Sequence, residues 1–363
     1  MKHFFSIDIG SNTIMMNAAC RLTLAELLDR KRPLNIVEET DHAKNQLKQT
    51  QWRRHRWLYT DYIRFASLGE KMAITKQISL ENLSKAIVIL KEFHSIIEKQ
   101  SGSKKIIAAV ATSALREALN NREALIAMED ALKAPINVIS GEKEGELTFL
   151  GSANHLRKPI VVIDIGGGST EIIFARRKKW QETISLPIGA VRWKDRFPST
   201  ILKNVDMQKN ASIEVVEQIT NSWEKHGGSK IKKMQGCSFY AVAGVPTTLC
   251  AIEYGYKLSD FTKLDNKTLS FETIKKLKEE ICSFSPDELE RNQDRFQAID
   301  KNRSEIMAIS TIIFESLLTF LSKELNGEKS VSISVRGLRY GLLHLLRKNL
   351  TNKYELEIKT ITS

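Results

Sequence analysis

The feature that most constrains this chain is a short pattern that occurs twice. Each copy is an apolar strand ending in Asp-Ile-Gly, followed by a turn of small residues and a second apolar strand. The first copy places Asp8-Ile9-Gly10-Ser11-Asn12-Thr13 at its turn, and the second places Asp164-Ile165-Gly166-Gly167-Gly168-Ser169-Thr170-Glu171 there. The β-branched residues before Asp164 predict a buried strand, and strand composition resumes at Ile172. Each copy is therefore predicted to be a hairpin, one in each half of the chain.

The turns of these hairpins have the chemistry of a phosphate site. Three glycines without Cβ atoms let backbone N–H groups approach an anion closely, and Ser169 and Thr170 add hydroxyl donors. Asp164 at the strand end suits Mg²⁺, which is typically held by one or two carboxylates together with water and substrate phosphates. Dinucleotide and Walker-type sites are excluded, because the turn leads into a strand and lacks both G-x-G-x-x-G and Gly-Lys-Ser/Thr. The alternative is a structural hairpin with a chance aspartate, and the second copy argues against it.

The rest of the chain alternates strands with helices. After a strand at 34–39, helices are predicted from Ser79 to a cap at Gly102, over 113–120, 121–133, 142–156 and 212–225, and from 247. Strands are predicted over 106–110, 136–139, 160–165 and 239–242. Helices over 270–283, 286–293 and 303–325 form a helix-rich C-terminal part, followed by a strand at 330–335 and a helix at 340–347; Pro286 suits a helix start. This alternation predicts an α/β fold.

Composition narrows the range of partners. The chain has 363 residues, enough for two domains, and its apolar fraction of 42% is ordinary for a globular protein. A net charge of +12 favours nucleic acid, an anionic membrane or a phosphate-rich substrate, and charge alone does not choose among them. The cysteines, Cys20, Cys237, Cys250 and Cys282, lack metal or disulfide spacing, which suits a reduced compartment. No apolar run reaches about 18 residues and the start lacks a signal peptide, so we expect a cytoplasmic protein without a membrane partner.

Residues 46–65 interleave basic and aromatic side chains, and we interpret them as an insertion. They include Trp52, Arg53, Arg54, His55, Arg56, Trp57, Tyr59, Tyr62, Arg64 and Phe65. Such a stretch suits the backbone of a polyphosphate or a nucleic acid. The alternative is an amphipathic cover that packs Trp57 and Tyr62 on the domain and leaves its arginines in water.

Taken together, these motifs resemble the exopolyphosphatase / guanosine pentaphosphate phosphatase family of the actin-like, sugar-kinase and Hsp70 ATPase superfamily. Besides the hairpins, the matching motifs are Ala111-Thr112-Ser113-Ala114-Leu115-Arg116-Glu117-Ala118, Ile139-Ser140-Gly141-Glu142-Lys143-Glu144-Gly145-Glu146-Leu147, Ser185-Leu186-Pro187-Ile188-Gly189-Ala190-Val191 and Arg336-Gly337-Leu338-Arg339-Tyr340-Gly341-Leu342-Leu343. The resemblance runs from the N-terminus to about Leu346. It implies two actin-like (ribonuclease H-like) α/β domains with a cleft between them. The first spans 1–141, with the insertion at about 46–65 and completion by about 330–350, and the second spans 142–329.

The resemblance also implies how the chemistry is divided. Glu144 matches the family's catalytic base, and Glu171 matches the residue that positions the attacking water. From the residues alone Glu144 could equally lie on a solvated helix face, because Glu142 and Glu146 flank it with the same charge. Only the family motif favours Glu144.

Metal and phosphate ligands follow from the same resemblance. Asp8 and Asp164 match the carboxylates on the side of a Mg²⁺ ion. The implied phosphate ligands are Ser11, Asn12, Thr13, Arg116, Gly166, Gly167, Gly168, Ser169 and Gly244. Arg116 follows a strand-to-helix junction, where a guanidinium can make a bidentate phosphate contact, and the alternative is a surface helix arginine.

The chain departs from the family pattern at several positions near the phosphates. Where the family usually has Gly-Gly-Thr before Thr-Thr-Leu, this chain has Ala243-Gly244-Val245-Pro246-Thr247-Thr248-Leu249. The arginine of an Arg-Leu-Gly-Glu segment is replaced by Ser67, and an arginine often found after the first hairpin is replaced by Met15 or Met16. Each change removes a candidate anion ligand, whereas the principal carboxylates and the triple glycine remain.

The sequence thus predicts a hydrolase that releases terminal phosphate from inorganic polyphosphate or guanosine pentaphosphate with Mg²⁺. One alternative is a non-catalytic member that binds polyphosphate or an alarmone, suggested by the departures. Another is a phosphotransferase with the actin-like fold. Such an enzyme needs a nucleotide pocket and an acceptor site, and no motif identifies either of them. The expected partner is the polyphosphate or phosphorylated guanine nucleotide substrate; a homodimer is also considered, and nucleic acid is not expected.

Overall fold

The computed structural model describes residues 2–22, 37–40, 47–54, 57–100, 104–226, 231, 234–257 and 260–362. Within it the chain divides into two compact units. Unit 1 comprises Met1–Ser140 and Leu338–Ser363, and unit 2 comprises Gly141–Gly337. The chain therefore leaves unit 1 once and returns to it at its C-terminal end.

Unit 1 is built on an eight-stranded sheet in the order β14-β6-β1-β2-β5-β4-β3, with β7 also paired to β6. Its strands are β1 (Lys2–Ile9), β2 (Thr13–Arg21), β3 (Val37–Thr40), β4 (Leu47–Arg54), β5 (Trp57–Phe65), β6 (Lys104–Ala111), β7 (Ile136–Val138) and β14 (Lys359–Thr362). β1 and β2 are antiparallel and form the predicted first hairpin, while β6 runs parallel to β1. The first predicted phosphate turn therefore lies at one end of central strands.

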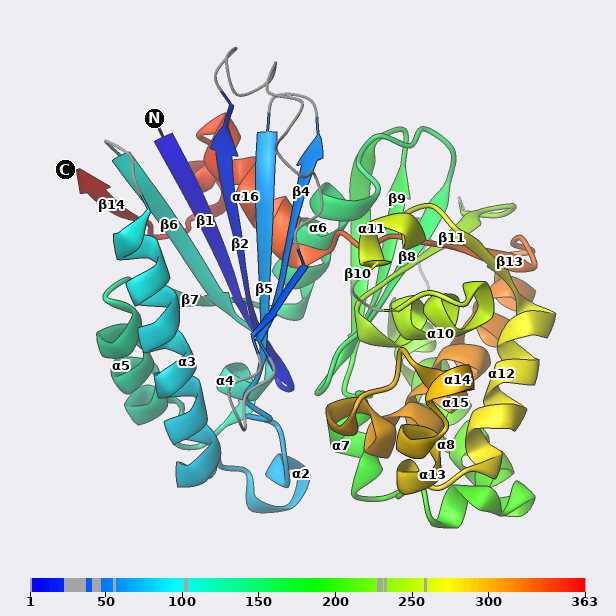
Figure 1. The fold of residues 1–363 in the computed structure, drawn as a ribbon. Helices are drawn as coiled ribbons and strands as arrows, with labels where there is room; N and C mark the ends of the chain where they lie inside the picture. Colours follow the sequence, from blue (N-terminus) through cyan, green and yellow to red (C-terminus); the bar gives the residue numbers. More distant parts are fainter. Residues whose placement is uncertain are drawn as a thin grey trace. The chain divides into compact units, whose positions relative to one another are not determined.

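The two faces of this sheet are covered by different helices. Phe5, Ile7 and Ile9 of β1 pack in one core with α3 (Leu80–Lys99) and α5 (Asn121–Leu132). α16 (Leu338–Lys348) contacts β1, β2 and β6 and lies on the opposite side of the sheet (Figure 1). Because strand residues alternate between faces, the even-numbered residues of β1, including Asp8, face α16. The short elements of unit 1 are α2 (Met72–Thr75), α4 (Ser113–Glu117) and η3 (Thr351–Tyr354).

The stretch interpreted as an insertion is instead part of this sheet. β5 pairs along its whole length with β2 and also pairs with β4. Tyr59, Tyr62 and Arg64 are buried, and Arg64 Nη2 donates to Glu92 Oε1 at 2.6 Å. Tyr62 packs in the core of unit 1, as the alternative interpretation states. Arg64 departs from that interpretation, because it is buried and paired instead of lying in water. His55 and Arg56 lie outside the described residues.

Unit 2 is built on a six-stranded sheet in the order β10-β9-β8-β11-β13-β12. Its strands are β8 (Ile160–Ile165), β9 (Thr170–Arg176), β10 (Lys179–Leu186), β11 (Ser238–Val242), β12 (Thr268–Ser270) and β13 (Ser330–Ile333). The order β10-β9-β8-β11-β13 repeats the order β5-β2-β1-β6-β7 of unit 1. In each case an antiparallel meander is followed by two parallel strands. The duplicated hairpins therefore mark a duplicated fold, and the predicted α/β class with two actin-like units is confirmed.

The predicted strand at 330–335 lies in this second sheet. It forms β13, which pairs parallel with β11 and antiparallel with β12. The strand thus belongs to unit 2 and not to the part that completes the first unit, because the chain returns to unit 1 only at Leu338.

Both faces of the unit 2 sheet are covered. α6 (Gly141–Ser152) packs on one face with Ile160, Val162 and Ile173. On the other face Val161 and Ile163 join a larger core with α8 (Val205–His226), α10 (Gly244–Tyr254), α12 (Phe271–Ser283) and α15 (Lys301–Glu324). The shorter helices are α7 (Ala190–Lys194), η1 (Ile201–Lys203), α11 (Phe261–Leu264), α13 (Pro286–Arg291) and α14 (Gln293–Phe296).

α15 is the most apolar long helix of unit 2. Among the described helices it alone has the length and composition to cross a membrane, but 78% of its most apolar window is buried inside the fold. α15 is therefore a core helix, because its apolar residues are already covered by the rest of unit 2.

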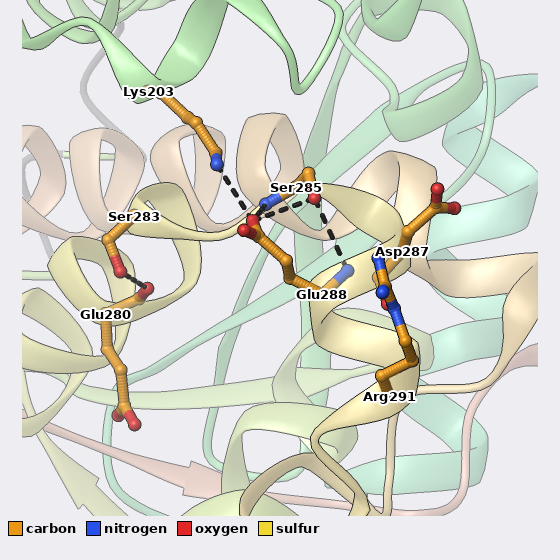
Figure 2. Close-up of polar contacts among 7 residues, drawn as sticks. All are labelled: Lys203, Glu280, Ser283, Ser285, Asp287, Glu288 and Arg291. Atoms are coloured by element: carbon orange, nitrogen blue, oxygen red, sulfur yellow. Dashed lines mark hydrogen bonds and ion pairs between the residues drawn. The ribbon is translucent and has the colours of Figure 1, made fainter.

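Pro286 begins α13, as the sequence predicts. Ser285 Oγ accepts from Glu288 N, and Glu288 Oε2 accepts from Ser285 N at 2.6 Å, which forms a capping box (Figure 2). Lys203 Nζ donates to the same carboxylate at 2.8 Å. The Lys203 and Ser285 donors together lower the pKa of Glu288 to about 2. The predicted helix over 286–293 is interrupted at Asn292, between α13 and α14.

Candidate active site

The second hairpin brings two of the predicted carboxylates together. Asp164 and Glu171 are direct cross-strand partners in the β8–β9 ladder. Asp164 lies two residues after Val162 on β8, and Glu171 lies two residues before Ile173 on β9. Residues two apart in a strand face the same side, so both carboxylates lie on the face of the sheet that α6 covers. Directly opposed residues have Cβ atoms about 5 Å apart. Two negative charges are therefore held at one edge of the sheet.

Each of these carboxylates is held by a hydroxyl. Ser185 Oγ donates to Glu171 Oε1 at 2.8 Å, and Glu171 is only 1% exposed. Thr148 Oγ1, from α6, donates to Asp164 Oδ2 at 3.0 Å. The hydroxyls fix the orientation of both carboxylates, and the motif around Ser185 is thus tied to the hairpin.

Two glycines explain how α6 brings Glu144 to the same face. A Cβ at Gly141 would lie 2.5 Å from the Ser185 side chain, and a Cβ at Gly145 would collide with Thr183. These glycines are one helical turn apart, and their partners are two residues apart on β10, so the helix lies directly against the strand. Consequently Glu144 is buried at 8% exposure. Its two neighbouring glutamates, at 142 and 146, are exposed and half-buried respectively.

The carbonyl oxygens of the glycine turn accept hydrogen bonds from residues 191 and 192, which fix its conformation. Gly167 O accepts from Val191 N at 2.8 Å, and Gly168 O accepts from Arg192 Nε at 2.7 Å. A Cβ at Gly189 would lie 2.5 Å from Gly167 O, so this close approach requires glycine. Within the described part of the chain, the N–H groups of Gly167 and Gly168 have no protein acceptor. They are available as donors to an anion.

The neighbouring strand brings another backbone donor set to the same edge. Val242 pairs with Asp164 in the parallel β8–β11 ladder, and α10 begins two residues later at Gly244. Gly244 is exposed, and Thr248 Oγ1 donates to its carbonyl at 2.7 Å. The unpaired N–H groups of a helix N-terminus favour anions, and Gly244 lies at such a terminus; its role as a phosphate ligand stays a prediction.

Ala243, where the family usually has glycine, has the backbone that glycine adopts most easily. Its φ is 73° and its ψ is −167°, a region that is almost restricted to glycine and costs about 1–3 kcal/mol for other residues. Val245, the other substituted position, is 4% exposed and packs in the core of unit 2. The first departure therefore strains the turn, whereas the second is accommodated by burial.

We expect Ala243→Gly to stabilise unit 2 by about 1 kcal/mol. The relief of strain exceeds the loss from a more flexible unfolded chain, which amounts to about 0.4–1 kcal/mol. Urea unfolding of the two proteins measures the difference. Ala241→Gly in β11, where φ is not positive, is the matched control and should destabilise the protein. If both substitutions destabilise the protein equally, Ala243 is not strained.

Arg303 is a basic residue of this region that the sequence did not reveal. It lies in the first turn of α15, and its Nη1 donates to Thr248 Oγ1 at 3.2 Å. Burial lowers the pKa of the Arg303 guanidinium, and Asp300 partly offsets this effect. The contact places a cation at the first turns of α10. Residues 248 and 303 are 55 positions apart, and no motif links them.

The first hairpin is built in the same way as the second. Gly10 N donates across the turn at 2.9 Å, as Gly166 N does in the second hairpin. The carbonyl oxygens of Ser11 and Asn12 accept from backbone N–H groups of residues 66–69 at 2.8–3.0 Å. A Cβ at Gly69 would lie 2.9 Å from Ser11 Cβ. The segment around Gly69 thus packs against the first turn and donates hydrogen bonds to its carbonyl oxygens, as residues 189–192 do for the second turn.

The motif at 111–118 also reaches the first hairpin. Ser113 Oγ lies 2.9 Å from Ser11 Oγ, within hydrogen-bond distance. Arg116, on the five-residue helix α4, donates from Nη1 to Ile139 O at 2.8 Å and is half-buried. It is therefore not an unattached surface arginine. Its guanidinium is fixed to the segment that leads out of unit 1.

A buried charge network lies on the face of unit 1 that carries Asp8. Asp61 accepts hydrogen bonds from Arg339 Nε at 2.9 Å, Tyr340 OH at 2.6 Å and Asn17 Nδ2 at 2.9 Å. Arg339 Nη1 lies 3.5 Å from Met15 Sδ, and Met15 is the cross-strand partner of Asp8. Burial alone lowers the pKa of Arg339, but the charges of Asp61 and Asp8 and the Tyr340 hydroxyl raise it above its usual value. A cation from α16 thus lies beside the position where the family often has an arginine.

Each unit carries an aspartate that suits a hard cation which keeps part of its own hydration. Asp8 and Asp164 each lie near a strand end beside a backbone loop. No group of three His, Cys, Asp or Glu side chains within the described ranges is placed to hold a metal ion. Mg²⁺ typically has one or two protein carboxylates and takes its other ligands from water and phosphate, whereas a structural zinc site needs four protein ligands. The residues therefore fit Mg²⁺ better than zinc.

The predicted residues fall into two groups. The group in unit 2 comprises Glu144, Asp164, Gly166, Gly167, Gly168, Ser169, Glu171 and Gly244. The group in unit 1 comprises Asp8, Ser11, Asn12, Thr13 and Arg116. Each group includes the Asp-Ile-Gly hairpin of its own sheet. The predicted cleft with the hairpins facing each other stays a prediction.

Two sheets of one strand order, each carrying an Asp-Ile-Gly hairpin, define an actin-like α/β protein. The model of the Ppx/GppA phosphatase family matches residues 59–349, which is most of the chain. The chain therefore belongs to the Ppx/GppA phosphatase family, as the sequence motifs indicate.

Individual relatives agree with this assignment. A bifunctional 3-dehydroquinate synthase/phosphatase of Fusobacterium nucleatum is 27% identical over 325 residues, which cover 88% of this chain and 43% of the relative. The chain thus spans less than half the length of that curated relative.

Solved structures share the fold. An exopolyphosphatase-like protein has a TM-score of 0.75 at 23% identity, with 96% of this chain and 99% of that chain covered. An exopolyphosphatase from Cytophaga hutchinsonii has a TM-score of 0.72 at 18% identity, with 96% and 98% covered. The Aquifex aeolicus Ppx/GppA family member has a TM-score of 0.66 at 24% identity, with 96% and 99% covered.

Proposed function

We propose that this chain hydrolyses terminal phosphoanhydride bonds and releases phosphate from inorganic polyphosphate or guanosine pentaphosphate. The observation that carries the proposal is the pairing of Asp164 with Glu171 on the face of the unit 2 sheet that is covered by α6, the helix on which Glu144 is buried. Beside them, the glycine turn has N–H groups without a protein acceptor among the described residues. Membership of a phosphatase family supports the reaction class. Two relatives named as an exopolyphosphatase or exopolyphosphatase-like protein support polyphosphate as a substrate.

In this proposal Glu144 is the general base that accepts a proton from the attacking water. Phosphoryl transfer needs an aligned water and charge stabilisation, with little covalent chemistry left for the protein. Glu171, fixed by Ser185, orients the water. The N–H groups of Gly167 and Gly168 bind the phosphate oxygens. Bound Mg²⁺ would neutralise the phosphate charge, and Asp164 and Asp8 are the residues that would hold it.

Phosphate release without an acceptor is the direct test of this proposal. The purified chain is incubated separately with polyphosphate and with guanosine pentaphosphate, each with and without Mg²⁺ and with no other nucleotide or phosphoryl acceptor. We expect phosphate release that depends on Mg²⁺. Release under these conditions excludes a phosphotransferase, which needs an acceptor. No release from either substrate contradicts the hydrolase proposal.

Asp164→Asn and Asp8→Asn are each expected to raise the Mg²⁺ concentration that gives half-maximal activity. Each substitution removes one negative charge from the proposed cation site while it keeps the shape of the side chain. Titration of activity with Mg²⁺ measures the shift. Asp206→Asn, at an exposed position of α8, is the control. Curves of both site variants that overlay the wild type contradict the assignment of the metal carboxylates.

Two observations favour a non-catalytic member as the second candidate. Ala243 strains the turn before α10, and Met15 or Met16 stands where the family often has an arginine. Both changes weaken anion ligands and leave the carboxylates in place. Tight binding of polyphosphate with no phosphate release in the same assay would support this candidate.

A further inference from the structure

Six basic residues gather at the end of the β8–β9–β10 meander that lies away from the candidate site. There β9 and β10 are joined by a two-residue turn, which is hydrogen-bonded to the segment that leads into β8. Arg177 N donates to Arg157 O at 2.9 Å, and Lys178 N donates to Leu156 O at 3.0 Å. The distal basic cluster comprises Arg157, Lys158, Arg176, Arg177, Lys178 and Lys179. Figure 1 shows these three strands in green.

The positive charge of this cluster is almost uncompensated. Arg176 is half-buried, and its other five members are exposed. Lys158 Nζ forms an ion pair with Glu328 Oε1 at 3.4 Å. Considering the described residues alone, the other five cations have no carboxylate within ion-pair distance. Repulsion among them remains unless an anion binds, so the cluster is a site of high positive potential.

The backbone of the turn indicates that these charges are not there for folding. Arg177 and Lys178 have φ values of 55° and 64°. A two-residue hairpin turn with positive φ at both positions favours Asn-Gly, because side chains with a Cβ are strained in this region. The chain thus places two cations where the fold itself favours uncharged turn residues.

We propose that the distal basic cluster binds the chain of a long inorganic polyphosphate while its terminal phosphate occupies the Asp164 end of the same strands. This inference rests on the proposed function. Arg176 lies five positions after Glu171 on β9, so the cluster lies roughly 20 Å from the hairpin at strand spacing. A long chain spans that distance, whereas tripolyphosphate does not.

The aromatic content of the cluster favours polyphosphate over single-stranded nucleic acid. Binding of unpaired bases uses aromatic faces for stacking. The aromatic residue next to the cluster, Trp180, is half-buried, packs with the core under α6 and donates from Nε1 to Thr183 Oγ1 at 2.9 Å. It is engaged in the fold, so the cluster offers charge without a stacking surface.

Binding at two places on one unit has a consequence for substrate length. Occupation of the cluster raises the effective concentration of the chain end near the hairpin. Long polyphosphate should therefore bind more tightly than short polyphosphate, and its binding should weaken more steeply with salt.

The double variant Arg177→Asn/Lys178→Gly tests the cluster without harming the fold. It removes two charges and installs the turn residues that this backbone favours. We expect the melting temperature to stay equal or rise. The affinity for polyphosphate of about a hundred units should fall by roughly ten- to thirtyfold. The slope of log affinity against log salt should become less steep by about 1.4. Affinity for tripolyphosphate should not change.

Lys209→Asn/Lys276→Asn is the matched control, because it removes the same charge from two exposed helix positions of unit 2. The control should keep its affinity for long polyphosphate. Equal losses in both double variants, or no loss in the turn variant, overturn the proposal. A loss of tripolyphosphate affinity equal to that for the long chain also overturns it, because the effect would then lie at the hairpin.

Binding is measured with Mg²⁺ present and in the Glu144→Gln background, so that the hairpin end keeps its cation and the probe is not consumed by hydrolysis. Failure of the phosphatase proposal and failure of this one are therefore distinguishable. Labelled polyuridine serves as the second probe. If polyuridine binds more tightly than polyphosphate and loses more affinity in the turn variant, the cluster serves nucleic acid and the polyphosphate assignment is wrong.

Discussion

Glu144→Gln is expected to bind substrate as the wild type does and to lose turnover by about 10²- to 10⁴-fold, the usual contribution of a general base. The amide keeps the shape of the side chain and one hydrogen-bond acceptor but takes no proton. The buried position of Glu144 on α6, the helix that covers the face of the sheet carrying Glu171, is the structural reason to single it out. Steady-state phosphate release gives the loss in kcat, and substrate binding by the inactive variant gives the affinity.

Glu142→Gln is the matched control on the same helix. Glu142 is exposed, carries the same charge and lies two positions away. Its variant should keep turnover close to that of the wild type. If Glu144→Gln stays within threefold of the wild type, Glu144 is not the base. If Glu142→Gln shows the greater loss, the assignment moves to Glu142.

Arg339→Met is expected to lower the free energy of unfolding by about 3–5 kcal/mol, because it leaves the Asp61 carboxylate buried without its cation. Asp61 is 2% exposed, so water cannot replace the lost partner without opening the packing of α16 on the sheet. Urea unfolding measures the change. Asp61→Asn in the Arg339→Met background should recover part of the loss, since it removes the stranded charge.

Arg64→Met is the control for this network in the same unit. Arg64 also pairs with a carboxylate, but its partner Glu92 has a side chain that is 34% exposed. Water can hydrate Glu92 after the substitution, so we expect a clearly smaller loss of stability. Equal losses in the two variants would mean that packing of the arginine stems, and not the buried charge, accounts for the effect.

Several features followed from local sequence with little help from tertiary contacts. The two Asp-Ile-Gly hairpins, the start of α3 after Ser79 and the start of α13 at Pro286 lie where the residues predict them. Hydrophobic periodicity, caps and turn residues act over a few positions, so they can be read from the chain. The structure shows that the repeated hairpin belongs to a repeated strand order in the two sheets, an order that the sequence did not specify.

The misplaced features depended on contacts between distant residues. Residues 57–65 read as a basic aromatic insertion, yet they form β5, because β2 and β4 cover both of its edges. The strand at 330–333 was assigned to the first unit, yet it pairs with β11 and β12. Strand composition identifies a strand but not its partner in a sheet.

In the candidate site, too, some features follow from local sequence and others depend on contacts between distant residues. The sequence by itself determined the carboxylates, the glycine turn and the family. The family motif favoured Glu144, and the tertiary structure adds the physical difference from Glu142 and Glu146: the glycines at 141 and 145 set which face of α6 lies against β10, and Glu144 is the buried glutamate of the three. The tertiary structure also brought Arg303 to Thr248 and Arg339 to the Asp8 face. Local sequence fixes which groups are present, whereas close packing of distant segments decides which of them share a site.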